Sequence, residues 1–513
     1  EVVAVVLDDP ANQSGDTDQL NLATLDSASG SSSGNVAVDL VAPELQLEKS
    51  VATPSDGFVD AGDTVTVRLD IQHTGASTAD AFNAVVTDTL PPDMAWGGDA
   101  NVNSTCAGLN IDSSANPVAF DFAELDLGLG ACFIEYQIIV GDLVNPGQTL
   151  INNAMLDYDS TPVFVSGQTR RRMESDTAEV TVLAPALVKA DVDTSQPDTG
   201  MAQGDPALRD LTIGETVTFE VTVVFPEGQT DNVVVVDALP ADADGVIEAI
   251  GATVTEIGAN ISTSLPGDAV LADERLDDGL NDTVTFDFDT VTNTPDGEDN
   301  AGDRIVMEIV GRVVDVPANA DGVVLVNNAE FAFDGDGGMP LTDNADIEIV
   351  EPQTNLTKSM GPVTDGTVRI SLSIENTGTA TAYDLSVEDV FDEADWDLSG
   401  FSPVSVPSGF TLDLQLDTPE SGQQTLVFAT DPGAVSPAGT VPVGASVSAV
   451  FDVPLAVLPP NPNPLPNTAD QVAGDSLPGD DPAARDLTTD SDTDQIGVPD
   501  LALTKTAALQ NDA

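Results

Sequence analysis

One pattern of short segments recurs along this chain at intervals of roughly 140 to 170 residues, and it limits the possible fold more than any other feature. Each copy opens with a segment that ends in lysine, such as Leu45-Gln-Leu-Glu-Lys49, and continues with Gly and a run of alternating residues, such as Gly214-Glu-Thr-Val-Thr-Phe219. Each copy closes with an Asn-containing segment, such as Leu325-Val-Asn-Asn-Ala329. Alternation with a period of two predicts half-buried strands, and no helical period is present.

Short strands between Gly, Pro, Asn and Asp turns, without helices between them, predict antiparallel sandwiches. We therefore expect an all-β fold of tandem Ig-like antiparallel β-sandwich domains in an elongated array. The expected divisions are the end of a preceding repeat at 1–42, Ig-like repeats at 43–184, 185–352 and 353–499, and the first strand of a following repeat at 500–513. Two interpretations of the ends stay open: a window on a longer tandem polypeptide, which we favour, or neighbouring copies that complete a shared domain by strand addition.

The charge balance excludes several classes of partner. The chain has 88 acidic and 14 basic residues and a net charge of −74, which repels nucleic acid and anionic membrane surfaces. No run of 18 apolar residues is present, so we expect no membrane span in this segment. Cys106 and Cys132 fall in one expected domain and predict a disulfide in an oxidising, extracellular setting, with two unpaired buried thiols as the alternative.

Lysine is rare in this chain and its placement is regular. The four lysines occupy the same position in the repeat, at the end of its first strand, whereas the ten arginines are scattered; the lysines are Lys49, Lys189, Lys358 and Lys505. The chain avoids lysine elsewhere but keeps one per repeat, which indicates that each repeat specifically requires a lysine side chain at this position.

Strand phase predicts that this lysine faces the core. Residues two apart share a face, so Lys49 points with Leu47, and Asp88 points with Val86. The same test turns Asn152 inward. Burying an unpaired charge costs several kcal/mol, so the lysine, the aspartate and the asparagine are expected to meet.

Two interpretations of such a buried set are open. Desolvation favours a neutral lysine amine, which is a nucleophile, and a protonated aspartate, which can polarise an amide carbonyl and move protons. This is chemistry for joining Lys to Asn as an isopeptide with loss of ammonia. The alternative is a buried Lys–Asp salt bridge with Asn as a hydrogen-bond partner and no covalent bond.

The lysine that ends the first strand, the Asp-Thr-Leu-Pro element and the closing Asn-x-Ala together resemble the surface-protein repeat called domain of unknown function eleven, and are similar to fimbrial isopeptide-forming domains. The resemblance implies an extracellular location, an Ig-like fold and an internal Lys–Asn bond promoted by an acid. Carried onto matching positions, it gives the sets Lys49, Asp88 and Asn152; Lys189, Asp237 and Asn327; and Lys358, Asp389 and Asn467. The third set departs from the pattern, because it lacks Leu-Pro after Asp389 and has Pro466 beside Asn467.

Acidic clusters make calcium a candidate cofactor. Calcium needs six to eight oxygen ligands, which short acidic loops can supply. The candidate ligands are Asp296, Glu298, Asp299 and Asp303; Asp334 and Asp336; and Asp490, Asp492 and Asp494. None of the clusters matches a full EF-hand loop, and a solvated acidic surface is the alternative.

These features favour an extracellular structural protein, a rod, stalk or filament at the cell surface, stiffened by Lys–Asn isopeptide bonds and calcium. Its partners would be copies of itself or neighbouring repeats of a longer chain. One alternative is an adhesin whose loops bind a host or matrix glycan or protein, although an aromatic content of 4% leaves few side chains to stack on sugars. The other alternative is a surface-lattice subunit. We expect no enzyme, because the chain has one histidine, no Gly-rich phosphate loop and no GxSxG motif.

Overall fold

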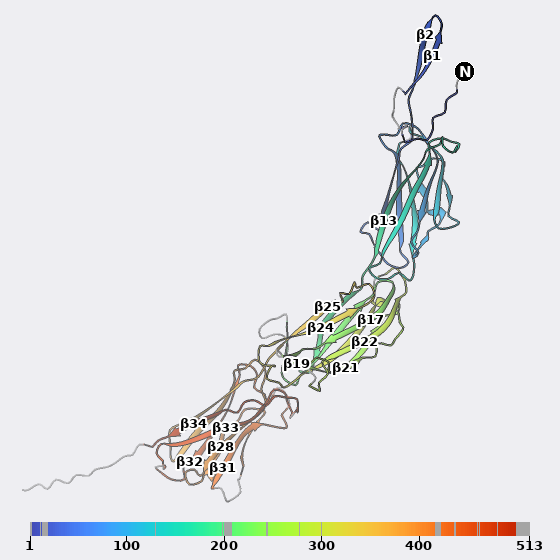
Figure 1. Ribbon diagram of the computed structural model, residues 1–513. Coiled ribbons are helices and arrows are strands. Elements are labelled where there is room, and N and C mark those ends of the chain that lie inside the picture. The colour runs from blue at the N-terminus through green and yellow to red at the C-terminus, as the bar shows by residue number, and fades with distance from the viewer. Residues whose placement is uncertain are drawn as a thin grey trace, which may run out of the picture.

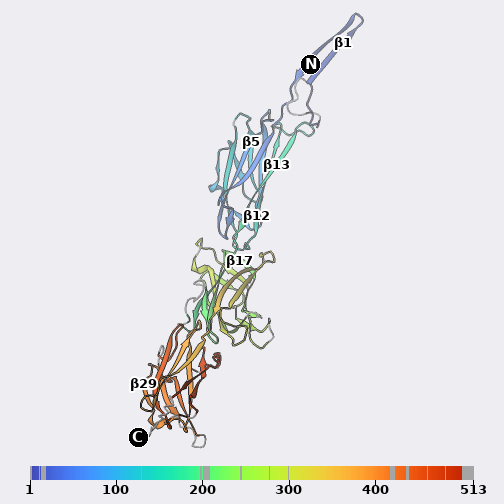
Figure 2. The ribbon, with the colours of Figure 1, turned by 90° about the vertical axis from the view of Figure 1, so that its left-hand side faces the viewer.

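Strands make up nearly all of the regular structure in this chain. The computed structural model describes residues 3–10, 12, 19–128, 130–196, 199, 208–242, 245–275, 278–298, 300–415, 422–434, 438–458, 460, 462–479 and 481–498. Within them, helical structure is limited to the short 3-10 segments η1 (Asp99–Asn101), η2 (Ala301–Asp303) and η3 (Leu398–Gly400). The sandwich units follow one another end to end in an elongated array, as Figures 1 and 2 show from two directions. The predicted all-β tandem fold is confirmed.

The first unit packs two sheets face to face. One sheet has the order β4 (Phe58–Val59), β13 (Arg171–Val182), β12 (Thr149–Asp159), β6 (Ala81–Thr89), β10 (Val118–Leu125) and β9 (Asn110–Asp112). The other has the order β3 (Leu45–Thr53), β5 (Thr64–His73), β11 (Cys132–Val140) and β7 (Met94–Trp96), with β8 (Asn103–Ser104) also paired to β11.

The second unit repeats this arrangement. Its first sheet has the order β14 (Ala186–Thr194), β16 (Thr216–Val224), β23 (Arg304–Val313), β19 (Gly245–Ile257) and β18 (Ala241–Asp242). Its second sheet has the order β15 (Arg209–Leu211), β25 (Leu341–Ile349), β24 (Val324–Ala332), β17 (Gly228–Ala238), β22 (Thr283–Asn293) and β20 (Ile261–Thr263), with β21 (Val270–Ala272) also paired to β22.

The third unit has the same plan with fewer strands. One sheet has the order β26 (Thr354–Met360), β27 (Thr367–Asn376), β32 (Ser446–Pro454) and β29 (Ser402–Ser405). The other has the order β30 (Phe410–Gln415), β31 (Gln423–Thr430), β28 (Tyr383–Asp392), β33 (Leu465–Asp475) and β34 (Ser491–Ile496).

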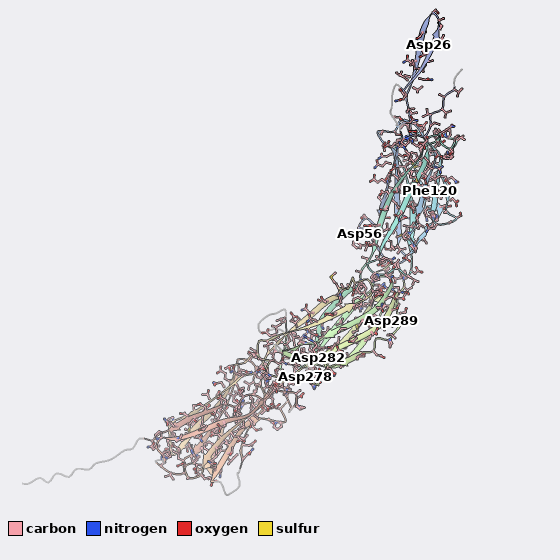
Figure 3. The ribbon with its side chains drawn as sticks, viewed as in Figure 1. Asp26, Asp56, Phe120, Asp278, Asp282 and Asp289 are labelled. Carbon is pink, nitrogen blue, oxygen red and sulfur yellow. A yellow bond between two sulfur atoms is a disulfide. The ribbon has the colours of Figure 1, made fainter. Side chains whose placement is uncertain are left out.

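Each unit has its own hydrophobic core between its two sheets. In β5, for example, alternate residues from Val65 to Ile71 are buried while their neighbours are partly exposed, as the period of two requires. Most of the described acidic side chains are not buried: Asp56 and Asp289, labelled in Figure 3, are exposed, whereas Asp282 and Phe120 in the same view are buried. Hence most of the acidic charge is surface charge on folded domains.

A two-stranded hairpin lies at the N-terminal side of the first unit. Its strands β1 (Gln19–Ser27) and β2 (Gly30–Val38) pair with each other, and every residue in them is exposed. The hairpin extends beyond the first sandwich (Figure 1), inside the segment expected to end a preceding repeat. Residues 500–513, expected to start a following repeat, lie outside the described residues.

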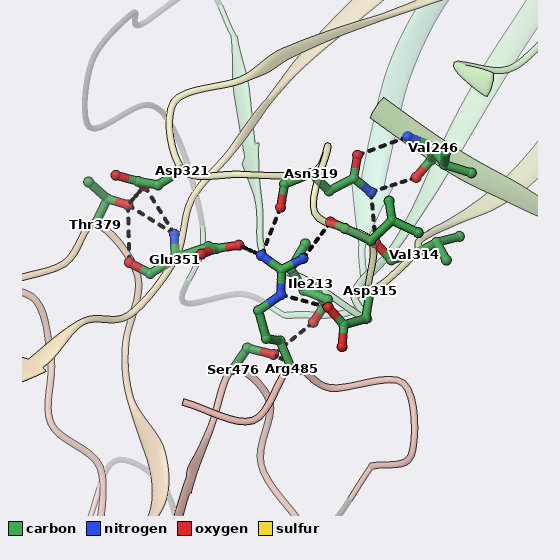
Figure 4. Close-up of polar contacts among 11 residues, drawn as sticks. Ile213, Val246, Val314, Asp315, Asn319, Asp321, Glu351, Thr379, Ser476 and Arg485 are labelled. Atoms are coloured by element: carbon green, nitrogen blue, oxygen red, sulfur yellow. Dashed lines mark hydrogen bonds and ion pairs between the residues drawn. The ribbon is translucent and has the colours of Figure 1, made fainter. Parts of the chain in front are cut away.

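An arginine fastens the third unit to the second (Figure 4). Arg485, in the loop between β33 and β34, pairs through Nε with Asp315 Oδ1 at 2.6 Å, and also pairs with Glu351. Its remaining donors reach the backbone carbonyls of Val316 at 2.6 Å and Asn319 at 2.9 Å. Ser476 at the base of the same loop donates to the carbonyl of Ile213 at 3.0 Å. The loop thus binds the end of the second unit through ion pairs and through hydrogen bonds to backbone carbonyls.

The first unit repeats this device toward the segment that precedes it. Ser160 Oγ accepts from the backbone N–H of Arg170 at 2.9 Å, as Ser476 Oγ accepts from that of Arg485 at 2.8 Å. The Arg170 side chain then binds a carboxylate and a backbone carbonyl, those of Asp8 and Asp9. We call this loop arrangement the Ser–Arg clamp. It joins each of these two units to the chain before it.

Replacing Arg485 with Ala is expected to loosen the junction between the second and third units, because four side-chain contacts across it are lost. Distances between spin labels on the two units, measured by pulsed electron resonance, should then spread over a wider range. Arg369→Ala is the matched control, since Arg369 pairs with Asp452 inside the third unit. An unchanged distance distribution in Arg485→Ala would show that the clamp does not hold the junction.

Candidate functional site

Strand register brings the aspartate and the asparagine of each repeat together on one sheet. In the first unit Asp88 of β6 pairs with Ala154 of β12, so Asn152, two residues earlier on β12, lies diagonally from Asp88 on the same face. The lysine approaches from the opposite sheet, because β3 pairs with β5. The same register recurs in the other units, where the pairs are Asp237 with Ala329 and Asp389 with Ala469.

All nine residues of the three sets are buried. The lysines are 3–5% exposed, the aspartates 0%, and the asparagines at most 6%. In every unit the lysine ammonium contacts the aspartate, and both side chains are fully buried; the pairs are Lys49 with Asp88, Lys189 with Asp237, and Lys358 with Asp389. The structure thus brings Lys and Asp together in each unit and places Asn beside them. Asn467 takes the same place in the third unit despite Pro466, and its Nδ2 donates to the carbonyl of Val390 at 2.8 Å.

Burial shifts the three lysines, Asp237 and Asp389 toward their neutral forms. It lowers the pKa of all three lysines below the ordinary lysine value, although the paired aspartate opposes the shift. It raises the pKa of Asp237, and it raises the pKa of Asp389 to about 6, while the paired lysine and the neighbouring asparagine oppose each shift. In the second and third units the lysine and aspartate shifts both favour the neutral amine and the carboxylic acid over the ion pair.

Each set leaves two buried oxygens without a hydrogen-bond partner. They are the Oδ1 oxygen of the aspartate and the Oδ1 oxygen of the asparagine, in Asp88 and Asn152, Asp237 and Asn327, and Asp389 and Asn467. An unsatisfied buried acceptor costs about 1–3 kcal/mol, and two acceptors cannot satisfy each other. A proton on the aspartate would turn one of the two acceptors into a donor.

Each set has a fourth member that strand phase alone did not reveal. Asp176 Oδ2 on β13 accepts from the backbone N–H of Lys49 at 2.6 Å, and the equivalent carboxylates bind the other two lysine strands at 2.7 Å; these are Asp343 to Lys189 and Asp492 to Lys358. Each of these aspartates lies opposite the alanine of the closing strand. The recurrence of Asp followed by Thr or Asn in the last strand was the available signal.

Tyr136 on β11 was also missed, and it belongs to the first unit alone. Its hydroxyl donates to Asp88 Oδ2 at 2.5 Å and accepts from Asn152 Nδ2 at 3.5 Å. Burial raises the pKa of Tyr136 well above the ordinary tyrosine value, so the hydroxyl stays protonated. Nothing in the sequence distinguishes this tyrosine from an ordinary core aromatic.

The two cysteines are joined. Cys132 at the start of β11 forms a disulfide with Cys106 across 26 positions of sequence. The bond ties the connection after β8 to the sheet that carries the lysine strand.

The candidate calcium ligands have partners within the chain. Asp303 accepts from the backbone N–H of Asn300 at 2.8 Å, and Asp296 accepts from Asn260 at 2.9 Å, while Asp299 lies outside the described residues. In the same cluster Glu298 donates its backbone N–H to Asp296. In the second cluster Asp334 accepts from Asn232, and Asp336 accepts from the N–H of Gly338. The third cluster lines the edge of β26, with Asp490, Asp492 and Asp494 accepting from the N–H groups of Leu356, Lys358 and Met360. Among the described residues, no group of three or more His, Cys, Asp or Glu is placed to hold a metal ion.

Calcium binding therefore stays a prediction, and melting measurements decide it. If the clusters bind calcium, a concentration one hundred times the dissociation constant should stabilise the fold by about 2.7 kcal/mol. The melting temperature in physiological salt should then fall when a chelator is added. An unchanged melting temperature would show that these carboxylates do not bind calcium and serve only as hydrogen-bond acceptors and surface charge.

Comparisons with known proteins add only a distant structural likeness. No family model matches the chain and no curated protein matches it, so the resemblance to domain of unknown function eleven stays a prediction. A backbone pilin of Streptococcus pyogenes has 10% identity, covering 88% of this chain and 80% of its own, with a TM-score of 0.25. The C-terminal domain of the antigen I/II polypeptide BspA of Streptococcus agalactiae has 10% identity, covering 60% and 100%, with a TM-score of 0.24. A structural likeness this distant carries no information about the function of this chain.

One further finding concerns membranes. In the part of the chain that the structure describes, no helix is long and apolar enough to cross a bilayer.

Proposed function

We propose that this chain is an extracellular structural rod whose Ig-like units each form an intramolecular isopeptide bond between lysine and asparagine. One observation carries the proposal: the same buried Lys, Asp and Asn recur in all three units, each with an aspartate and an asparagine oxygen that lack partners. A salt bridge alone would leave those oxygens unsatisfied in every unit, whereas a protonated aspartate that binds the amide carbonyl uses both.

The proposed step exchanges one amide for another. The neutral Nζ amine of the lysine attacks Cγ of the asparagine, while the protonated aspartate binds the carbonyl oxygen and stabilises its developing negative charge. The Nζ–Cγ bond forms, the Cγ–Nδ2 bond breaks, and ammonia leaves with the proton that the amine gives up. No oxidant, reductant or cofactor is needed.

The bond would join the two sheets of each unit. Lys49 lies on β3 of one sheet and Asn152 on β12 of the other, so the covalent link would cross the core. It would enclose most of the unit between its ends, which suits a rod that resists pulling and proteolysis. The Ser–Arg clamps would add stiffness between units.

The setting we propose is the cell exterior, with copies of the chain or neighbouring repeats as partners. The disulfide requires an oxidising compartment to form and persist. The net charge of −74 keeps such a surface soluble and away from nucleic acid. The tandem of similar units suits end-to-end extension of a stalk or filament.

Amine labelling of the denatured chain tests the proposal. Lys49, Lys189 and Lys358 should resist an amine-reactive reagent in strong denaturant, because their Nζ atoms are in amide bonds. Asp237→Ala is the control, because loss of the acid should leave the Lys189 amine free, and Lys189 should then react fully. Full labelling of Lys49, Lys189 and Lys358 in the wild-type chain would refute the crosslinks and leave buried salt bridges.

A further inference from the structure

The first unit differs from the other two at one position beside its buried set. Tyr136 on β11 pairs with Val67 of β5, two residues before the partner of Lys49. The same register position holds Ile309 in the second unit and Phe451 in the third, and both are fully buried. The first unit alone therefore has a hydroxyl at this place.

The hydroxyl of Tyr136 bridges the two groups that the proposed reaction uses. It donates to Asp88 Oδ2 at 2.5 Å and accepts from Asn152 Nδ2 at 3.5 Å. Asp88 in turn contacts the Lys49 ammonium. A continuous hydrogen-bonded path thus runs from the attacking nitrogen through Asp88 and Tyr136 to the nitrogen that must leave.

We infer that Tyr136 is a catalytic residue of the first unit, which passes a proton to the departing nitrogen of Asn152. This inference rests on the proposed isopeptide function. A planar amide nitrogen is not basic, and in the resting structure it donates to the hydroxyl. Once the lysine amine has attacked Cγ, that nitrogen gains a lone pair, and the same hydrogen bond can reverse its direction.

The proton balance closes within these residues. Asp88 already holds the proton that Lys49 gave up when its amine became neutral. As the Nζ–Cγ bond forms, Asp88 therefore takes a second proton from the amine at Oδ2 and passes it to Tyr136 in the same step. Tyr136 gives its hydroxyl proton to Nδ2 as the Cγ–Nδ2 bond breaks, and it recovers a proton from Asp88. Ammonia departs with the two hydrogens of the original amide and one from the lysine, and Tyr136 and Asp88 end as they began.

The second and third units lack this path, because Ile309 and Phe451 carry no exchangeable proton. There the aspartate alone must both stabilise the carbonyl oxygen and deliver a proton to the leaving nitrogen. One chain therefore contains a unit with the relay and two units without it, which supplies internal controls for any change at Tyr136.

Tyr136→Phe removes the hydroxyl and keeps the ring, and it is the direct test. The full chain is produced by cell-free translation, and samples are denatured at intervals to stop the reaction. The 49–152, 189–327 and 358–467 crosslinked peptides are then each quantified by mass spectrometry. Positioned proton donors contribute about 100-fold or more, so bond formation in the first unit should slow by about that factor. The other two bonds should form at their wild-type rates.

The outcomes separate this inference from the function on which it rests. A 49–152 bond that forms at the wild-type rate in Tyr136→Phe overturns the role of Tyr136, while absence of all three bonds in the wild-type chain overturns the proposed function. Formation of the Cys106–Cys132 disulfide in the variant reports that the first unit has folded. If it has not, the wild-type time course in heavy water replaces the variant: the first unit should slow more than the other two, and equal slowing would contradict the relay.

Discussion

Asp237→Ala should abolish the Lys189–Asn327 crosslink and destabilise the second unit by about 3–5 kcal/mol, the usual cost of removing one partner of a buried ion pair. The variant removes the acid that polarises the amide carbonyl and leaves the Lys189 amine buried without its partner. Peptide mapping should show separate peptides in place of the 189–327 crosslink. Denaturant unfolding should show the loss of stability in the second unit.

Glu330→Ala is the matched control for that experiment. Glu330 is an exposed carboxylate on β24, the strand that also carries Asn327. Its removal should change stability by no more than about 0.5 kcal/mol and leave the crosslink intact. Persistence of the 189–327 crosslink in Asp237→Ala would show that the aspartate does not promote the bond.

Pulling the chain from its ends should reveal the second large effect. A bond between Lys189 and Asn327 prevents roughly 140 residues from being stretched. When the second unit unfolds under force, its gain in contour length should therefore be smaller by roughly 480 Å. In the wild-type chain the second unit should therefore lengthen only by the segments outside the bond. Lys189→Met should restore the missing length, measured in single-molecule force spectroscopy.

Glu330→Ala provides the comparison for the pulling experiment, because Glu330 is an exposed carboxylate on β24 and is not part of the buried set. It should leave every unfolding step unchanged. Release of the full length of the second unit by the wild-type chain would contradict a covalent link across it.

The placement of the buried sets was predictable because strand alternation is local. A period of two is enough to turn Lys49, Asp88 and Asn152 inward, and their rarity or recurrence marked them as a set. The all-β tandem fold followed from the same alternation and from the turn residues between strands. Neither step required knowledge of how the sheets stack.

The missed residues depend on contacts between elements distant in sequence. Asp176 binds the Lys49 N–H because the edges of β3 and β13 meet at one side of the sandwich, and strand phase does not fix that meeting. Tyr136 reads as a core aromatic until its distance to Asp88 is known. The Ser–Arg clamp required the relative placement of two units, since Arg485 finds its partners about 130 to 170 residues earlier in the chain.

Asp492 illustrates how the same residue type can support two interpretations. In the sequence it belongs to an acidic run that suggests calcium. In the structure the run alternates along β34, and Asp492 accepts the backbone N–H of Lys358. Carboxylates at every second position of a strand point to one side. Such a row of carboxylates can accept the backbone N–H groups of a neighbouring edge strand as readily as it can bind a metal ion.

The intact mass of the folded chain, measured after the disulfide is reduced, tests the central claim most directly. Each isopeptide bond removes one ammonia, about 17 Da, so three bonds should make the chain about 51 Da lighter than its sequence mass. That deficit should vanish unit by unit as Asp88, Asp237 and Asp389 are each replaced with Ala, once the mass of the substitution is allowed for. A folded wild-type chain with the full sequence mass would contradict the crosslinks in all three units.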